Sequence, residues 1–397
     1  MDEMNINLQD ADFKSYLTQA QTCVNCYCGL CVAYCPAYEE TKDESVSARG
    51  LAQIMDAVKR GELSLEEIPD DVLYSCTGCR WCEWNCSLNT PLYIVQHGDR
   101  VTKVSGATMT EIMRSMKVER GRIPQVIKDA LDSIVRVGNP YGKSKDIKDK
   151  WVEDLGLKFG GEDTLLYVGS TVPYEDRSTK MAEALVELLK RAGFRFSMLG
   201  SEESDSGAFA RYMGEEGLFA ELVERLAALF AEKGIKRVIC LSPHDYDAFL
   251  SCYQKNGSIE FRHYSQVLLE LIQDKRIAPK RSLNKRVTYH DPCYLGRKLN
   301  IFEPPREVLK SIPGLELVEM GRNREMAYCC SGGGTGLWYE LPRFHMNYTR
   351  VDQAKEKNPD YLAVACPICL QMLDDGVKTR NYDFQVKDLS QILLEAL

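Results

Sequence analysis

Sixteen cysteines are the residues of this 397-residue chain best suited to chemistry. Nine precede residue 90, five form a pattern between Cys293 and Cys369, and Cys240 and Cys252 lie outside both groups. The sequence starts with MDEMNINLQDADF, which is acidic and lacks the apolar segment of a secretory signal. We therefore expect a cytoplasmic, reducing compartment, where clustered thiols more often bind metal or do redox chemistry than form structural disulfides.

The segment CTGCRWCEWNC has the spacing of an iron-sulfur cubane site. In a C-x₂-C-x₂-C-x₃-C run, a short loop wraps three thiolates around one [4Fe-4S] cube, and the fourth cysteine ligates another cube. The run consists of Cys76, Cys79, Cys82 and Cys86. A partner run is therefore required.

The segment CVNCYCGLCVAYCP supplies that partner. Its Cys28, Cys31 and Cys35 fit the register, so we expect Cys35 to complete the cube of the second run and Cys86 to complete the first cube. The remaining position is Asn25, and the cysteines that flank it are Cys23 and Cys26. Cys23 is favoured because it leaves the loop more slack, but either cysteine can be the ligand. Structural zinc is the alternative, although zinc sites use two pairs rather than two triplets with distant fourth ligands.

A second pattern of five cysteines lies near the C-terminus. Cys293 is followed after 35 residues by adjacent Cys329 and Cys330, and after another 35 by Cys366 and Cys369 in the order Cys-Pro-Ile-Cys. Adjacent cysteines do not easily ligate one tetrahedral zinc, and five thiolates exceed what one zinc or one cube needs. The pattern indicates a larger or less regular metal cluster.

Short apolar runs alternate with amphipathic helices from Thr164 onward, which is typical of an α/β fold. LLYVG, FRFSML and RVICLSP read as strands, and RVTYHDP, LELVEM and YLAVACP read as a second set. YSQVLLEL from Tyr264 matches LSQILLEA from Leu389 at an offset of 125 residues. The C-terminal part is therefore expected to contain two copies of one unit.

The five-cysteine array, in the setting YHDPCYLGR, AYCCSGGGTG and ACPICLQML, resembles the cysteine-rich domain of heterodisulfide reductases. The fused layout is also similar to the iron-sulfur subunits of glycolate oxidase and anaerobic glycerol-3-phosphate dehydrogenase. The resemblance implies a noncubane [4Fe-4S] cluster, held by the five cysteines, where disulfides are cleaved. Ser331 departs from the glycine usual after the cysteine pair.

The first copy of the unit lacks these cysteines. By the offsets, the ligand positions carry Ser170, Asp205, Ser206, Ser242 and Asp245. A hard oxygen set does not hold an iron-sulfur cluster, so we expect a degenerate copy that forms one wall of the site. Binding of a hard metal or a substrate by these polar residues is the alternative.

The predicted fold is α+β with several domains. Residues 1–100 form a helical ferredoxin-like domain with two cubanes, 101–160 a helical connector, 161–280 the degenerate repeat and 281–397 the repeat with the noncubane cluster. The net charge of −8 argues against a nucleic-acid partner, and no run of eighteen apolar residues spans a bilayer.

Several other features have both a functional and a structural interpretation. His290 and His244 adjoin the ligand positions and could pass a proton to a departing thiolate, although a histidine at a strand end is more often only hydrogen-bonded. Four cations could form a positive rim or a solvated face, namely Arg297, Lys298, Arg322 and Arg324. The SGGGTG loop from Ser331 lacks the Lys-Ser/Thr of a P-loop, so its glycines more simply let the backbone approach the cluster.

Two functions fit these features. The first is an oxidoreductase that delivers electrons through two cubanes to a disulfide, small or protein-borne, at the noncubane cluster. The second is an electron-transfer subunit of a flavin dehydrogenase that feeds quinone or a cytochrome. The expected partners are a flavoprotein or membrane cytochrome, through which the chain could lie on the inner face of the membrane.

The three predicted cluster sites set an iron content that can be measured. We expect about twelve irons and about twelve sulfides per chain after anaerobic purification, because each [4Fe-4S] cluster contributes four of each. Iron and sulfide counting with electron paramagnetic resonance checks this number. Zinc in place of iron would contradict the assignment.

Overall fold

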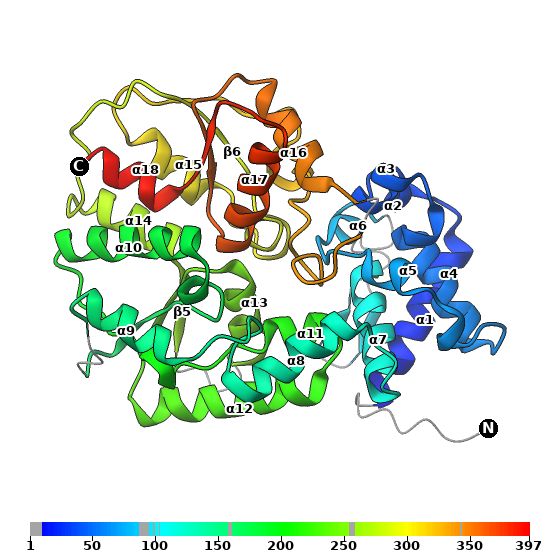
Figure 1. Cartoon of the computed structure of the whole chain (residues 1–397). Helices are drawn as coiled ribbons and strands as arrows, with labels where there is room; N and C mark the ends of the chain where they lie inside the picture. The colour runs from blue at the N-terminus through cyan, green and yellow to red at the C-terminus, as the bar shows by residue number, and fades with distance from the viewer. Residues whose placement is uncertain are drawn as a thin grey trace. The chain divides into compact units, whose positions relative to one another are not determined.

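The structure is a computed structural model that describes residues 10–86, 95–97, 100–102, 104–157, 161–253, 259–341 and 344–397 (Figure 1). Its contacts divide the chain into two compact units. The first unit combines Met1–Lys128, Ala210–Glu216 and Gly333–Met346, and the second combines Asp129–Phe209, Gly217–Gly332 and Asn347–Leu397. Part of the predicted connector thus lies in each unit, and the predicted four-part division stays a prediction.

The first unit is mainly helical. Its helices are α1 (Asp10–Cys26), α2 (Leu30–Ala33), α3 (Pro36–Thr41), α4 (Ala48–Lys59), α5 (Asp70–Tyr74), α6 (Trp81–Trp84), α7 (Gly106–Glu119) and α11 (Ala208–Met213, whose last four residues belong to it). A short antiparallel pair, β1 (Val95–His97) and β2 (Arg100–Thr102), accompanies them.

Helix α4 is stabilised at its start and along its apolar face. The Ser47 hydroxyl caps it by accepting a hydrogen bond from the Gly50 amide at 3.0 Å, and Gly61 follows its end at φ 69°. Its apolar face packs against α1 and α7. Local capping and helix packing therefore both hold this helix in place.

The second unit contains two parallel sheets. One has the order β3-β4-β5, and the other β7-β6-β8-β9. The strands are β3 (Thr164–Tyr167), β4 (Arg237–Cys240), β5 (Glu260–His263), β6 (Arg286–Tyr289), β7 (Glu316–Leu317), β8 (Tyr361–Val364) and β9 (Gln385–Asp388). The helices are α8 (Gln125–Val137, from Asp129), α9 (Asp146–Asp154), α10 (Asp176–Arg191), α12 (Glu216–Glu232, from Gly217), α13 (Pro243–Cys252), α14 (Tyr264–Gln273), α15 (Glu303–Lys310), α16 (Met346–Lys355, from Asn347), α17 (Pro367–Thr379) and α18 (Leu389–Glu395).

The elements of the two sheets follow the predicted offset. β8 begins 124 positions after β4, and β9 begins 125 positions after β5. The helices that follow β5 and β9 start with the same capping box, in which Gln266 and Gln391 accept from the backbone N–H of His263 and Asp388. The local sequence thus sets the same strand-to-helix turn twice.

The two halves pack on one another through helices. α10 and α18 lie side by side (Figure 1), and the Ser390 hydroxyl donates to the Met181 carbonyl at 2.9 Å. The Tyr264 hydroxyl donates to the Asp388 carboxylate at 2.5 Å. Both contacts are buried, so the second unit has one continuous core.

In the second unit, one predicted strand is wrong and two strands were not predicted. FRFSML forms only an isolated parallel bridge between Leu165 and Ser197, because the segment leaves the sheet edge after one residue pair. β5 and β9 were missed because EFRH and QVKD are too polar for an apolar-run criterion. Among the described residues, no helix is long and apolar enough to span a membrane.

Candidate metal centres

Four thiols of the first unit line one cavity. Cys35 precedes α3, Cys76 and Cys79 lie in the loop between α5 and α6, and Cys82 lies in α6. The rest of the lining is largely apolar, with Val46 and Leu51 among its side chains. The pKa of Cys35 is raised to about 12, mainly by burial and to a smaller extent by the neighbouring Cys79 and Cys76. Four partly buried thiols around one space are the donor set that a cubane requires.

Two arginines hold the loop of the second run. Arg80 adopts φ 60° within this run, and its guanidinium pairs with Glu83 at 2.5 Å and Glu111 at 3.0 Å. The same guanidinium donates to the Ser105 hydroxyl at the start of α7. The loop is therefore tied to α7 by a buried charge network.

Arg114 on α7 is 1% exposed and binds three backbone carbonyls. It donates to Leu73 at 2.9 Å, to Cys76 at 2.8 Å and to Tyr212 at 2.9 Å, and its guanidinium lies over the Tyr74 ring. Burial raises the pKa of Cys76, and the charge of Arg114 opposes that rise. Arg114 thus fixes the ligand loop and favours a thiolate there.

The thiols of the first run gather with Cys86. The pKa of Cys23 is raised to about 12. Burial is the largest cause, and the negative charges of Cys31, Cys86 and Cys28 contribute less. Burial also raises the pKa of Cys31 to about 12, and here Cys86 is the strongest neighbour. Cys86 therefore lies with the first run, as the predicted exchange of fourth ligands requires. Cys26 ends α1 as a further neighbour of Cys23, and the choice between these two cysteines as the ligand stays a prediction.

The five C-terminal cysteines follow strands of one parallel sheet. Cys293 comes four positions after β6, and Cys329 and Cys330 lie in the loop between β7 and α16. Cys366 follows β8 as the N-cap of α17, and Cys369 lies in the first turn of that helix. Because the carboxyl ends of parallel strands meet at one edge, the tertiary fold brings this array together. The N-terminus of α17 also favours thiolate at Cys366 and Cys369.

This array is buried and closely spaced. Cys293 is 8% exposed, and the other four cysteines are at most 3% exposed. The Cys330 and Cys369 sulfurs are 3.4 Å apart. Hydrogen bonds from Cys329 and Cys369 lower the pKa of Cys330 well below its usual range, whereas sharing that proton with Cys330 raises the pKa of Cys369. The site is therefore built to hold negative sulfur away from water.

The turn after Cys329 and Cys330 requires an unusual backbone conformation and little side-chain volume. Ser331 adopts φ 75°, the conformation that glycine favours, and its amide donates to the Cys329 sulfur at 3.3 Å. A Cβ on Gly332 would meet Ile368 at 2.4 Å, and one on Gly334 would meet the Cys76 carbonyl at 2.7 Å. Serine thus preserves the turn, and the glycines permit close backbone packing, as predicted.

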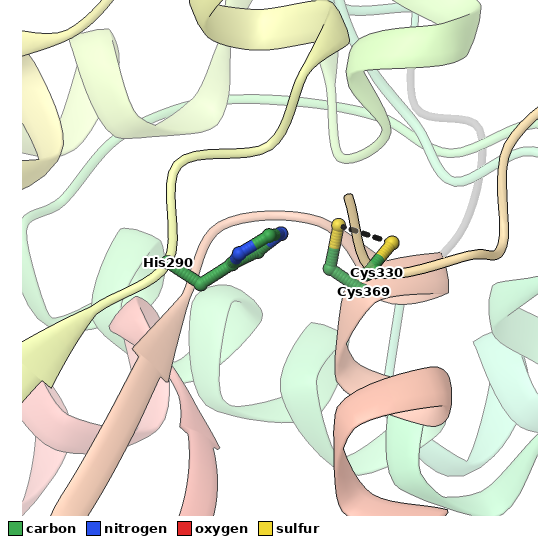
Figure 2. A group of neighbouring side chains, drawn as sticks. All are labelled: His290, Cys330 and Cys369. Atoms are coloured by element: carbon green, nitrogen blue, oxygen red, sulfur yellow. Dashed lines mark hydrogen bonds between the residues drawn. The ribbon is translucent and has the colours of Figure 1, made fainter. Parts of the chain in front are cut away.

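Both predicted histidines adjoin the array, and Figure 2 shows the His290 ring pointing toward the Cys330 and Cys369 sulfurs. Ligand atoms of His290, Cys330 and Cys369 lie within 4.8 Å of one another. His244, from the degenerate repeat, packs on Tyr294 with ring centroids 4.0 Å apart. Burial lowers the pKa of His290, and it lowers that of His244 to about 4, so both rings are neutral near pH 7.

The four cations of the predicted rim have internal partners. Arg297 donates to the Ala327 carbonyl at 2.7 Å, and Lys298 pairs with Asp247 at 2.5 Å. Arg322 donates to the Met326 carbonyl at 3.2 Å, and Arg324 pairs with Glu303 at 2.9 Å. These contacts support the structural interpretation. Arg350 is a fully buried cation of this region, and it was not predicted because it sits in the polar segment MNYTRVDQAK.

The degenerate repeat brings its substituted positions together as well. The Ser170 hydroxyl donates to Asp205, and the Ser206 hydroxyl donates to Asp245 at 2.6 Å. Ser242 caps α13 by accepting from the His244 amide at 3.2 Å. Hydrogen-bonded oxygen atoms thus stand at the positions where the other repeat has sulfur.

Comparisons with known proteins agree with this division. Residues 19–90 match the family model of a 4Fe-4S dicluster domain, and residues 287–374 match that of a cysteine-rich domain. The chain is 34% identical over 345 residues to "Probable iron-sulfur-binding oxidoreductase FadF" of Bacillus subtilis, covering 83% of this chain and 47% of that protein. It is 29% identical to EtfAB:quinone oxidoreductase of Syntrophomonas wolfei, covering 98% of this chain and 60% of that protein.

A third relative matches over nearly its whole length. The chain is 30% identical over 409 residues to one of the subunits of dihydromethanophenazine:CoB–CoM heterodisulfide reductase from Methanosarcina barkeri. The match covers 96% of this chain and 95% of that relative. The chain thus spans about half of the first relative and three fifths of the second, but nearly all of the third.

The Arg114 contacts predict a local effect on the second run. Arg114→Met should lower stability by about 3 kcal/mol, because buried carbonyls lose their donor. It should also selectively weaken one cubane signal, measured by electron paramagnetic resonance with iron counting and thermal melting. Arg120→Met, at the exposed end of the same helix, is the matched control and should change stability by less than about 1 kcal/mol. Equal iron content and melting temperature in both variants would contradict this role.

Asp245 predicts a pH dependence of stability. Burial raises its pKa to about 8, so the folded chain keeps a proton that the unfolded chain, with the ordinary value of 3.8, releases. Stability should therefore fall as pH rises between about 4 and 8. Asp245→Asn keeps an acceptor for Ser206 and should flatten this slope by up to about 1.4 kcal/mol per pH unit. Anaerobic melting curves at pH 5 to 8 test this, with exposed Asp163→Asn as control; parallel curves for Asp245→Asn and the wild type count against it.

Proposed function

Because the chain belongs to the heterodisulfide reductase family of iron-sulfur oxidoreductases, we propose that it passes electrons through two [4Fe-4S] cubanes to a noncubane [4Fe-4S] site. A disulfide is reduced, or formed, at that site. The first cubane is held by Cys23, Cys28, Cys31 and Cys86, and the second by Cys35, Cys76, Cys79 and Cys82. The five C-terminal cysteines hold the noncubane cluster.

The observation that carries this proposal is the buried five-thiol array beside a buried arginine. Arg350 is 0% exposed and makes no direct ion pair with a carboxylate among the described residues. Burial lowers the pKa of Arg350 to about 10, and the charge of Asp291 opposes that fall only in part, so an anionic group beside Arg350 would stabilise it. A cluster bound by five thiolates supplies that negative charge, and the donor set therefore fits it.

A short segment of chain links the residues beside the second cubane to the C-terminal site. Gly334 packs against the backbone of Cys76, and the Thr335 hydroxyl donates to the Tyr74 carbonyl at 3.2 Å. Only three residues separate Gly334 from Cys330 in the sequence. The second cubane is accordingly the donor to the C-terminal site, and the first cubane is where electrons enter.

The chemistry requires two electrons and two protons, since RS–SR′ + 2e⁻ + 2H⁺ gives RSH and R′SH. Bound iron-sulfur clusters supply electrons one at a time. The degenerate repeat has no second array of five thiols, and its His244 packs against the Tyr294 ring. Cleavage is therefore one-sided, which favours a protein-borne or small disulfide substrate.

A second function is an electron-transfer subunit of a flavin-dependent dehydrogenase that feeds quinone or a cytochrome. It is favoured by the match of 98% of the chain to an EtfAB:quinone oxidoreductase. In both functions the partners are other redox subunits, a flavoprotein or a membrane cytochrome. The chain works in the cytoplasm, held at the inner face of the membrane by such a partner.

Loss of one C-terminal thiol tests the proposal. We expect Cys330→Ser to abolish disulfide turnover driven by a reduced viologen dye, because the cluster loses a ligand. It should also abolish a new paramagnetic signal that appears when the reduced wild type is oxidised by an added dye in the presence of the substrate thiol. The cubane signals should remain in the variant.

Cys252→Ser is the matched control, because Cys252 lies outside both arrays. It should keep turnover and every signal. The assignment fails if Cys330→Ser keeps both the new signal and turnover. A wild type that copurifies with a flavoprotein and reduces quinone without disulfide turnover supports the electron-transfer function instead.

A further inference from the structure

Arg350 and His290 form a hydrogen-bonded pair behind the five-cysteine array. The Arg350 Nε–H donates to His290 Nδ1 at 3.0 Å, and its Nη1 donates to the Arg322 carbonyl and the Gln353 side chain, each at 2.8 Å. Both side chains are at most 1% exposed. Two strong contacts besides the histidine thus fix the guanidinium in place.

This geometry determines which nitrogen of His290 carries the proton. Because Arg350 can only donate, Nδ1 must accept through its lone pair, so the ring proton is on Nε2. A doubly protonated ring is excluded, since it would set two N–H groups against each other. The Nε2 atom is buried, and the ring points toward the Cys330 and Cys369 sulfurs (Figure 2).

The hydrogen bond from Arg350 also decides whether His290 is a metal ligand or an N–H donor. Its position within 4.8 Å of two sulfurs is also compatible with a metal ligand. A ligating Nε2 needs a free lone pair, and the usual support for such a histidine is an acceptor at the opposite nitrogen. Arg350 is a donor at that nitrogen, so the pair is built for the opposite tautomer.

We infer that Arg350 is a positioning residue that holds His290 as an N–H donor to the sulfur of the C-terminal cluster, and that this pair raises the reduction potential of that cluster. The inference rests on the proposed function, because it assumes a cluster on the five cysteines. One electron from the second cubane reduces the cluster, and no covalent bond forms or breaks. An N–H donor and a buried cation both stabilise the more negative, reduced state.

The direction of the effect can be measured as a midpoint potential. His290→Phe keeps an aromatic ring but removes the donor, and we expect reduction to become about tenfold less favourable. This corresponds to a midpoint potential about 59 mV lower for a one-electron couple. The measurement is an anaerobic redox titration of the full chain, followed by electron paramagnetic resonance, with the two cubanes in the same sample as internal controls.

Two further variants separate the donor from the charge. His290→Gln retains a side-chain N–H and should recover part of the potential. Arg350→Met removes both the charge and the support of the ring, so we expect a larger drop than in His290→Phe, whereas Arg350→Lys keeps the charge and should fall between wild type and Arg350→Met. Iron content and melting temperature report whether each variant still folds and holds its clusters.

Pulsed resonance gives a readout that a merely structural role would not change. In D₂O, an exchangeable deuteron coupled to the C-terminal cluster should be present in wild type and absent in His290→Phe. A strong nitrogen coupling from His290 would show direct ligation and overturn the inference. An unchanged potential in His290→Phe with full iron content would also overturn it, while the absence of any C-terminal cluster in wild type would instead refute the proposed function.

Discussion

The burial of sulfur ligands is the constraint on which the rest of this structure depends. Thiols that are shielded from water resist ionisation, and even partial burial raises the pKa of Cys23, Cys31 and Cys35 to about 12. Such groups become thiolates only when a metal or a nearby cation stabilises the negative charge. The chain therefore surrounds its thiols with fixed cations and amide donors, and Arg114 and Arg350 are the clearest examples.

The two units meet this constraint in different ways. In the first unit, short helices and left-handed turns bend the backbone around the thiols, and arginine side chains fasten the turns to α7. In the second unit, a parallel sheet gathers distant loops at its carboxyl edge, and the N-terminus of α17 carries two of the five cysteines. Compact local wrapping suits a cube, and a wide sheet edge suits an irregular array with five ligands.

The degenerate repeat shows how the same arrangement of strands and helices packs without the five cysteines. Serine and aspartate pair where the other repeat has cysteines, so the interior remains hydrogen-bonded and closed. The α/β packing survives, since α10 still lies against α18 and both sheets keep their capping boxes. The repeat therefore retains a structural role beside the five-cysteine array, and His244 packs on Tyr294 of the other repeat.

The sequence alone determined the cysteine arrays and the offset between the repeats, and it predicted the exchange of ligands between the two runs, because spacing and local capping are encoded in short segments. It left the choice between Cys23 and Cys26 open, and it missed β5, β9, Arg114 and Arg350. Tertiary structure decided the two strands and the two arginines, since polar edge strands carry no apolar signal and a buried arginine looks like any surface arginine until distant segments close over it. The proton position on His290 likewise follows only from the arginine 60 positions away that the fold brings to its ring.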